Sequence, residues 1–378
     1  FMTMLTGNVF SQLIPFVLAP ILARIFTPNE FAVLANFMAI VGMLGIVATA
    51  RLELAIPIPK DNHEAQGIAF TGFTFTLLLG VLSLLIPIFS DQIGLLYHDN
   101  ILPSFLWLVP VSIISMGFLG LSNNWGLRQQ KFKSISIGKI AQSLINNGLA
   151  AILGYWGWGI NGLIIAWLLS QFVNIAILSL SFNTKVQLKS FGKKTVIATL
   201  QQYRDFPLIN TLHAFTDVFI TQFLFFWIIS VRFGQTELGY FAVMNKYVRA
   251  PIILITSSVA QLYYTESGKF LQENKSPLQL LNRTLRTTII FAIPFTIILL
   301  FWAPVLFEWY LGPQWIQSGV YARSLAPLLF LMFIVSPISG TPILMKRQKS
   351  AFVFSLIGYA FSFGAFGLAV LANYSFST

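Results

Sequence analysis

The chain has 378 residues, of which 56% are hydrophobic and only 9% are charged, and its mean hydropathy is +0.77. A soluble protein carries about 25% charged residues because its surface faces water, so this composition excludes a soluble globular domain and predicts that lipid is the solvent. The net charge of +11 is typical of the basic loops of a membrane protein, and we expect no nucleic-acid partner. The absence of cysteine excludes disulfides and thiolate metal sites.

Eleven apolar stretches are long enough to cross the hydrocarbon core as helices. They are continuously apolar rather than alternating, which excludes a closed β-barrel. In chain order they cover residues 5–25, 31–50, 67–90, 101–122, 136–154, 159–182, 206–231, 238–262, 287–308, 323–345 and 350–372. We therefore predict an all-α polytopic membrane protein. The tenth stretch holds three prolines, which kink helices, and it is the best candidate for a bending element.

The distribution of Lys and Arg predicts the orientation in the membrane. Eighteen of the 23 fall in one set of alternate loops and three in the other set, while Lys246 and Arg249 lie inside the eighth stretch. The basic side of a membrane protein faces the cytoplasm, so we expect a cytoplasmic N-terminus and a multi-pass protein of the bacterial inner membrane. The outer loops, including 309–322, are short. They leave no room for the external domain that a membrane glycosyltransferase or ligase needs.

The longest strongly basic connection, residues 183–205, predicts a cytoplasmic linker between two bundles. It separates an N-terminal six-helix lobe, residues 1–182, from a C-terminal lobe, residues 206–378, in which five helices are present. Two pseudo-symmetric bundles of six plus six transmembrane helices would leave the twelfth helix missing, so we expect the chain to be a fragment.

A weak internal repeat supports this division. Arg24 precedes Glu30 in the first hairpin, and Arg232 precedes Glu237 some 207 residues later, each pair being followed by an apolar helix. Residues 27–30 also form a helix capping box with Pro at the first helical position, so capping explains the first pattern equally well. Parallel repeats are common in transporters.

Three charges fall inside the predicted membrane helices. At 1.5 Å per residue, Asp217 in the seventh stretch lies roughly 16 Å from the cytoplasmic side, and Lys246 and Arg249 lie roughly 12 and 16 Å from the outer side. Asp217 can therefore pair with one of the two cations and leave a positive charge over, and His213 can share its helix face. Two interpretations stay open. One is an ion pair that joins two helices, and the other is a cationic cavity that receives an anionic group.

Three further charges lie where the first two stretches end. Arg24 closes the first stretch, and Arg51 with Glu53 closes the second. Long basic side chains near a helix end commonly extend to the lipid headgroups. The alternative is that Arg51 and Glu53 line the inner mouth of a cavity.

The sequence contains no motif for nucleotide hydrolysis, metal binding or nucleophilic catalysis. No Gly-rich phosphate loop is present, no His, Asp and Glu cluster has metal-ligand spacing, and three histidines give no credible catalytic triad. We therefore expect no catalytic residues, no metal and no cofactor.

A series of short motifs follows a consistent order over nearly the whole chain. They are Thr6-Gly7 with Gln12, Leu22-Ala23-Arg24 before Thr27-Pro28-Asn29-Glu30-Phe31, Ala50-Arg51-Leu52-Glu53-Leu54-Ala55-Ile56 before Lys60-Asp61, Arg128 with Lys131-Phe132, Tyr203-Arg204-Asp205-Phe206-Pro207 with Asn210, Gly239-Tyr240, Pro251, Gln261 with Tyr263, Gly312-Pro313-Gln314-Trp315 with Tyr321-Ala322-Arg323, Pro337 and Arg347-Gln348-Lys349. In these motifs the chain resembles the Wzx-type O-antigen and polysaccharide flippases of the multidrug/oligosaccharidyl-lipid/polysaccharide exporter superfamily.

The resemblance implies two six-helix lobes around a central cavity that moves an undecaprenyl-diphosphate-linked oligosaccharide across the inner membrane by alternating access. It implies that Arg24, Arg51, Lys246 and Arg249 bind the diphosphate. Asp217 and Glu53 are the candidates for ion coupling or charge pairing. The implied partners are the lipid-linked oligosaccharide, membrane lipids and other polysaccharide-assembly proteins. The alternative is a drug/cation antiporter of the same superfamily, which should carry surplus acid in its cavity.

Overall fold

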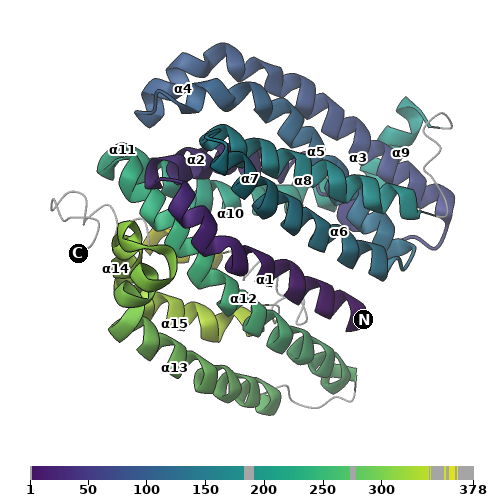
Figure 1. Cartoon of the computed structure of the whole chain (residues 1–378). Coiled ribbons are helices and arrows are strands. Elements are labelled where there is room, and N and C mark those ends of the chain that lie inside the picture. The colour runs from purple at the N-terminus through teal and green to yellow at the C-terminus, as the bar shows by residue number, and fades with distance from the viewer. Residues whose placement is uncertain are drawn as a thin grey trace. The chain divides into compact units, whose positions relative to one another are not determined.

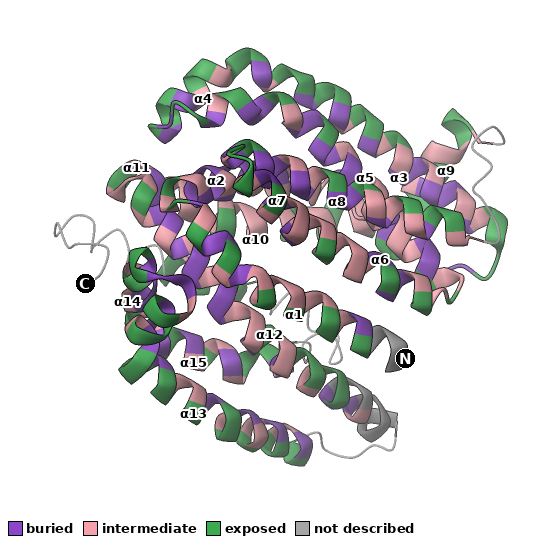
Figure 2. Cartoon of the chain, in the orientation of Figure 1, coloured by how far each residue is buried: buried purple, intermediate pink, exposed green. Residues whose placement is uncertain are grey.

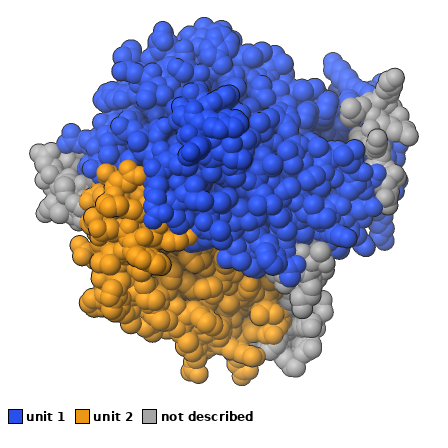
Figure 3. Space-filling model, viewed as in Figure 1, with its two compact units in different colours: residues 1–239 blue, residues 240–378 orange. Residues whose placement is uncertain are grey.

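The computed structural model describes residues 2–182, 191–272 and 278–339, together with Thr341, 353–354, 357–361 and Gly364. Within these ranges the chain is helical and contains no strand (Figure 1). The predicted all-α class is therefore confirmed. The chain divides into two compact units, Phe1–Gly239 and Tyr240–Thr378 (Figure 3).

The first unit follows the predicted stretches closely. Its α-helices are α1 (Met2–Ile25), α2 (Pro28–Gly45), α3 (Asn62–Leu82), α4 (Ser90–Tyr97), α5 (Val109–Arg128), α6 (Phe132–Leu144), α7 (Ala150–Tyr155), α8 (Ile160–Ser181), α9 (Lys193–Gln202), α10 (Thr211–Val218) and α11 (Phe225–Phe233). Short 3₁₀ segments join α3 to α4 and precede α5. Single π-helical turns join α6 to α7 and α10 to α11.

The start of α2 is fixed by local chemistry. The Thr27 hydroxyl accepts a hydrogen bond from the Glu30 amide at 3.3 Å, and the Glu30 carboxylate accepts one from the Thr27 amide at 2.7 Å. Pro28 occupies the first helical turn, where its missing N–H costs nothing. The predicted capping box is therefore present.

The end of α2 differs from the prediction, because the helix stops at Gly45 rather than at residue 50. Ala50 and Arg51 adopt positive φ angles of 52° and 58°, and a 3₁₀ helix follows over Leu52–Ala55. Positive φ is uncommon for residues with a Cβ and is incompatible with a continuing α-helix. The segment that carries Arg51 and Glu53 is therefore a compact turn and not the last turn of a helix.

The basic linker is partly structured. Residues 183–190 lie outside the described ranges, but α9 covers Lys193–Gln202 and packs on α3. Glu64 on α3 accepts two hydrogen bonds on one carboxylate oxygen, from the Gln202 amide at 2.6 Å and from the Tyr203 hydroxyl at 2.8 Å. The end of the linker is thus attached to the N-terminal end of α3.

The seventh predicted stretch packs within the first compact unit. Helices α10 and α11 contact α2, and the buried Asn36 amide donates hydrogen bonds to Ser230 at 3.4 Å and Gln235 at 3.2 Å. The boundary between the compact units therefore falls after this stretch. The predicted division into lobes at residues 183–205 is not tested by this boundary and stays a prediction.

The second unit is built from long helices and one bent pair. Helix α12 (Gln235–Gln272) begins in the first unit and continues into the second, where α13 (Leu278–Leu311), α14 (Ile316–Ser324) and α15 (Ala326–Val335) follow. The predicted loop over 309–322 is wrong, because most of it is helical. A 59° bend separates Pro313–Ser324 from Ala326–Ile338, directly before Pro327. The eleventh predicted stretch lies mostly outside the described residues.

Seven helical segments within the described ranges are long and apolar enough to cross a membrane, and the bent pair adds an eighth. The seven are Thr6–Ile25, Pro28–Gly45, Asn62–Tyr97, Leu102–Arg128, Ile160–Ser181, Phe206–Phe233 and Leu278–Leu311. The segments α6–α7 and α12 are long enough but less apolar, since they carry residues such as Lys139 and Lys246. Many large apolar residues are exposed, and Leu180 is 87% exposed. Figure 2 shows exposed residues along most of the helices. This pattern is typical of a protein whose solvent is lipid.

Candidate functional site

Lys246 and Arg249 line one cavity in the second unit, with a volume of about 360 Å³. The two residues lie three positions apart on α12 and therefore share a helix face. The remaining lining residues are Asn245, Ala250, Ile252, Ile253, Thr256, Met332 and Ser336. The second of the two sequence interpretations, a cationic cavity, thus has a matching feature in the structure.

The far wall of this cavity comes from the bent pair. Ser336 follows α15 and donates a hydrogen bond to the Thr256 hydroxyl at 3.4 Å, and Thr256 donates to the Ile252 carbonyl at 2.8 Å. These hydroxyls join α12 to the segment after the bend. A change in the bend angle would therefore move one wall of the cavity relative to the other.

The electrostatic character of the cavity is positive. Lys246 has an exposed side chain, and its ammonium lies 5.4 Å from the centre of the Tyr247 ring, a cation–π distance. No Asp or Glu lies among the described residues that line the cavity. A site with two cations and neutral amide and hydroxyl groups is suited to an anion that needs several hydrogen-bond donors.

Arg51 and Glu53 form an ion pair in the first unit, with 3.6 Å between Arg51 Nη1 and Glu53 Oε1. Glu53 is buried and also accepts a hydrogen bond from the Thr49 hydroxyl. The Arg51 side chain is 26% exposed, and its buried Nε makes no hydrogen bond to a described residue. The Arg51 guanidinium can therefore donate hydrogen bonds to a further group besides Glu53. Uncommon backbone conformations such as that of Arg51 cluster at functional sites.

Arg128, at the end of α5, holds the segment that follows this ion pair. Its Nη1 donates to the carbonyls of Ile56 at 3.2 Å and Pro59 at 2.5 Å. Its Nη2 and Nε reach Lys60, Asp61 and the side chain of Asn62 at 2.9 to 3.3 Å. A planar guanidinium with five donors suits this task and an ammonium does not. In the sequence Arg128 is recognisable only as a loop cation and a motif residue, because most of its acceptors are backbone groups about 70 residues away.

Arg24 and Asp217 are neither among the residues that line the cavity nor part of the Arg51–Glu53 ion pair. Arg24 is exposed in the last turn of α1 and forms no hydrogen bond or ion pair with the described part of the chain. Asp217 is half-buried on α10 in the first unit, and its carbonyl accepts a hydrogen bond from Thr221 at 2.7 Å. Its pairing with Lys246 or Arg249 stays a prediction. Among the described residues, no three His, Asp or Glu side chains are placed to hold a metal.

Comparisons with known proteins give the family and the fold. A family model described as "Polysaccharide biosynthesis protein" matches residues 21–319. The succinoglycan biosynthesis transport protein ExoT of Rhizobium meliloti (strain 1021) is 22% identical over 283 residues, which cover 74% of this chain and 55% of the relative. The chain thus spans about half the length of that curated relative.

Two solved structures share the fold. The lipid II flippase MurJ in an inward closed conformation has a TM-score of 0.74 at 17% identity, over 93% of this chain and 78% of that chain. An inward-facing multidrug resistance MATE family transporter has a TM-score of 0.64 at 14% identity, over 92% and 83%. These relatives are named as transporters and a flippase, and none is named as an enzyme.

Proposed function

The chain belongs to the family of polysaccharide biosynthesis proteins, and we propose that it moves an undecaprenyl-diphosphate-linked oligosaccharide across the bacterial inner membrane by alternating access. The oligosaccharide is an O-antigen or a similar polysaccharide repeat unit. The transported molecule is therefore a long apolar chain, a doubly anionic linkage and a polar sugar. Membrane lipids surround the protein, and other polysaccharide-assembly proteins act before and after it.

One observation carries this proposal: Lys246 and Arg249 line the same cavity. A diphosphate is bound well by arginine, which can contact two oxygens at once, and by lysine, which acts as a point charge. Two cations on one helix face within a bilayer favour the approach of an anion. An anionic substrate that enters the cavity would lie beside both of them, and this supports a role for both residues in binding.

The other predicted residues have secondary roles in the proposal. Arg24 and Arg51 supply further positive charge to the path of the diphosphate. Arg51 can release Glu53 when the diphosphate arrives, because a phosphate oxygen offers it a stronger charge-assisted hydrogen bond than a carboxylate 3.6 Å away. Glu53 and Asp217 are then the groups that could take up a proton or another cation, which would couple transport to an ion gradient.

The alternative is a drug/cation antiporter, and the similarity of the fold to a multidrug resistance transporter favours it. Such a protein must attract a cationic drug. The cavity around Lys246 instead has two cations and no acidic residue among its described lining residues, and like charges at close range repel. The charge of the cavity therefore supports the flippase over the antiporter.

The test uses the full-length protein in liposomes that carry a fluorescent polyprenyl-diphosphate oligosaccharide in one leaflet. A membrane-impermeant quencher reports the fraction of substrate that has crossed. We expect wild-type protein to accelerate the crossing, and Lys246→Ala and Arg249→Ala to slow it by about tenfold each, the effect of losing one charged hydrogen bond. Lys194→Ala removes an exposed lysine of α9, outside the cavity, and should flip at the wild-type rate.

Two outcomes would contradict the proposal. One is protein-dependent efflux of a cationic dye with no crossing of any lipid-linked glycan, which would establish the antiporter. The other is equal flipping by wild type, Lys246→Ala and Arg249→Ala, which would remove the cavity from the mechanism while leaving the flippase activity in place.

A further inference from the structure

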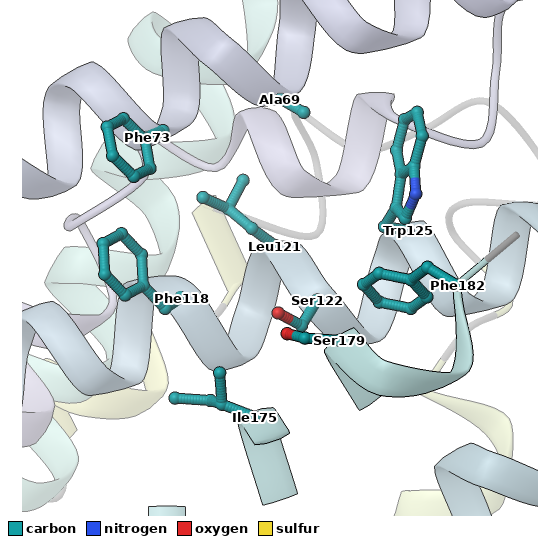
Figure 4. Close-up of a pocket in the computed structure, with 9 residues that line it drawn as sticks. All are labelled: Ala69, Phe73, Phe118, Leu121, Ser122, Trp125, Ile175, Ser179 and Phe182. Carbon is teal, nitrogen blue, oxygen red and sulfur yellow. The ribbon is translucent and has the colours of Figure 1, made fainter. Parts of the chain in front are cut away.

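A second cavity lies in the first unit, with a volume of about 240 Å³ (Figure 4). Helix α5 forms its floor with Phe118, Leu121, Ser122 and Trp125, at spacings of three, four and seven residues. These positions form one stripe along a helix. The stripe is about 10 Å long at 1.5 Å per residue, so the cavity is a groove that runs along the helix axis.

The walls of the groove come from the two helices that pack on either side of α5. Helix α3 contributes Ala69 and Phe73, α8 contributes Ile175 and Ser179, and Phe182 directly follows α8. These residues again follow helical spacings of three, four and seven. All three helices have the length and hydropathy of membrane-spanning segments, so the occupant that suits the groove is a linear chain aligned with these helices.

The lining of the groove is suited to a hydrocarbon. Phe73 and Phe118 stack with their ring centres 5.2 Å apart. Ser122 and Ser179 contribute the hydroxyls of the lining (Figure 4), and apart from them and the Trp125 indole the described lining is apolar. Each methylene that leaves water for such a surface contributes about 0.8 kcal/mol in general, but here the competing solvent is lipid. Shape and aromatic contact must therefore select the occupant.

The groove has a charged end. Trp125 lies one turn before Arg128 in α5, and Lys131 and Lys133 follow the helix. This end of the bundle is also the end that the loop charges predict to face the cytoplasm. A chain held in the groove therefore has its head beside basic residues, which favours an anionic headgroup.

The groove is next to the ion pair described above. Gly120, beside Leu121 on α5, faces Glu53, since a Cβ at Gly120 would lie 3.7 Å from Glu53 Cγ. Leu121 and Trp125 also share a buried cluster with Leu52, which lies between Arg51 and Glu53 in sequence. Helix α5 thus carries a hydrocarbon groove on one face and borders the Arg51–Glu53 turn on another.

We propose that this groove binds the polyprenyl chain of the lipid-linked substrate in the cytoplasmic leaflet, with the phosphate end toward the basic end of α5. This inference rests on the proposed function, because that function supplies a substrate with both a long chain and an anionic linkage. The acyl chain of an ordinary anionic phospholipid is the competing occupant.

The test is photo-crosslinking with full-length protein in nanodiscs made of phosphatidylethanolamine and phosphatidylglycerol. The probe is a polyprenyl phosphate that carries a diazirine in its chain. We expect crosslinked peptides from α3, α5 and α8 that contain residues 69–73, 118–125 and 175–182. Unlabelled polyprenyl phosphate should compete with the probe, and added phosphatidylglycerol at the same mole fraction should not.

Ser179 lines the groove and is exposed, so Ser179→Trp places an indole in the groove. Leu180→Trp is the control, because Leu180 is 87% exposed and does not line the groove. We expect Ser179→Trp to lower crosslinking about tenfold, because the indole takes the space of the chain and disturbs the fit to the aromatic lining, and Leu180→Trp to leave it unchanged. Equal thermal stability of the two variants would show that both fold.

Crosslinks outside these three segments, equal crosslinking in Ser179→Trp, or equal competition by phosphatidylglycerol would each overturn the inference. The liposome assay separates this result from the proposed function. Wild-type flipping together with a failed crosslink would reject the groove alone, whereas absence of wild-type flipping would reject the proposed function.

Discussion

The hydroxyl of Thr236 donates a hydrogen bond to Asn29 Oδ1 at 2.7 Å, across 207 residues of sequence. The same offset relates the first residues of two helices, Pro28 of α2 and Gln235 of α12, and it relates Glu30 to Glu237. Asn29 and Thr236 therefore occupy the same position in the two halves of the weak sequence repeat. The contact therefore joins the starts of the two helices that the weak repeat relates.

The two helix starts are packed tightly at this point. Gly239 lies in the first turns of α12, and a Cβ there would overlap the carbonyl of Pro28. We predict that Gly239→Ala lowers the free energy of unfolding by about 1–3 kcal/mol, the usual range for overpacking, although alanine favours a helix more than glycine does. Thermal unfolding in detergent measures the loss. Gly148→Ala is the control, since a Cβ there meets nothing within 4 Å, and an equal effect of both variants would contradict the close contact.

Arg128 should control the order of the segment from Ile56 to Asn62. Arg128→Lys replaces a planar five-donor group with one that cannot reach all of these acceptors, and we expect a loss of about 1–3 kcal/mol in local stability. Hydrogen exchange of the peptide that covers residues 54–64 should then become roughly tenfold faster or more. Arg323→Lys changes an exposed arginine and should leave that exchange unchanged. Unchanged protection in Arg128→Lys would show that other contacts hold the segment.

The ion pair of Arg51 and Glu53 should be visible in a double-mutant cycle. Arg51→Met and Glu53→Gln each leave a partly buried polar partner unpaired, and we expect each to cost about 1–3 kcal/mol. The double variant should lose less than the sum of the two, with a coupling energy of at least about 0.5 kcal/mol. The free energy of unfolding of the four proteins gives this energy, and strictly additive losses would contradict the pair.

Tyr203 should give the protein a measurable response at alkaline pH. Its burial, and then the hydrogen bond to Glu64 and the charge of Glu64, raise the pKa of Tyr203 from 10.0 to about 12, while Arg128 acts in the opposite direction. Because the pKa is higher in the folded state, the contribution of Tyr203 to stability is complete below about pH 10. It is lost as the pH rises toward about 12.

The measurement compares wild type with Tyr203→Phe. The difference in their unfolding free energies should shrink as the pH rises from about 10 to about 12, and the tyrosinate absorbance of wild type should contain a phase near pH 12 that Tyr203→Phe lacks. Tyr155→Phe changes a tyrosine that is 82% exposed and should keep that phase. A late phase that survives in Tyr203→Phe would assign it to another tyrosine.

Part of the candidate site could be predicted from residues alone. Lys246 and Arg249 were found because charge is rare inside apolar stretches, and their spacing of three residues places them on one helix face. Glu53 was a candidate for charge pairing, but Arg51 was not predicted as its partner, because residues two positions apart do not face each other on a regular helix. Their contact depends on the left-handed turn at Ala50 and Arg51. The hydrogen bonds from Arg128 to the segment from Ile56 to Asn62 were not predicted. Most of their acceptors are backbone carbonyls, which every residue has, so no residue pattern in the sequence indicates them.

The sequence by itself determined that this chain is a helical membrane protein, because hydropathy and the obligation to satisfy backbone hydrogen bonds in lipid leave few other structures. It also determined the start of α2, since a capping box acts within four residues. Only the tertiary structure decided the bend at Leu325, the groove along α5 and the contact of Asn29 with Thr236. Each of these depends on side chains from distant segments, and neither hydropathy nor local capping specifies which helix packs against which.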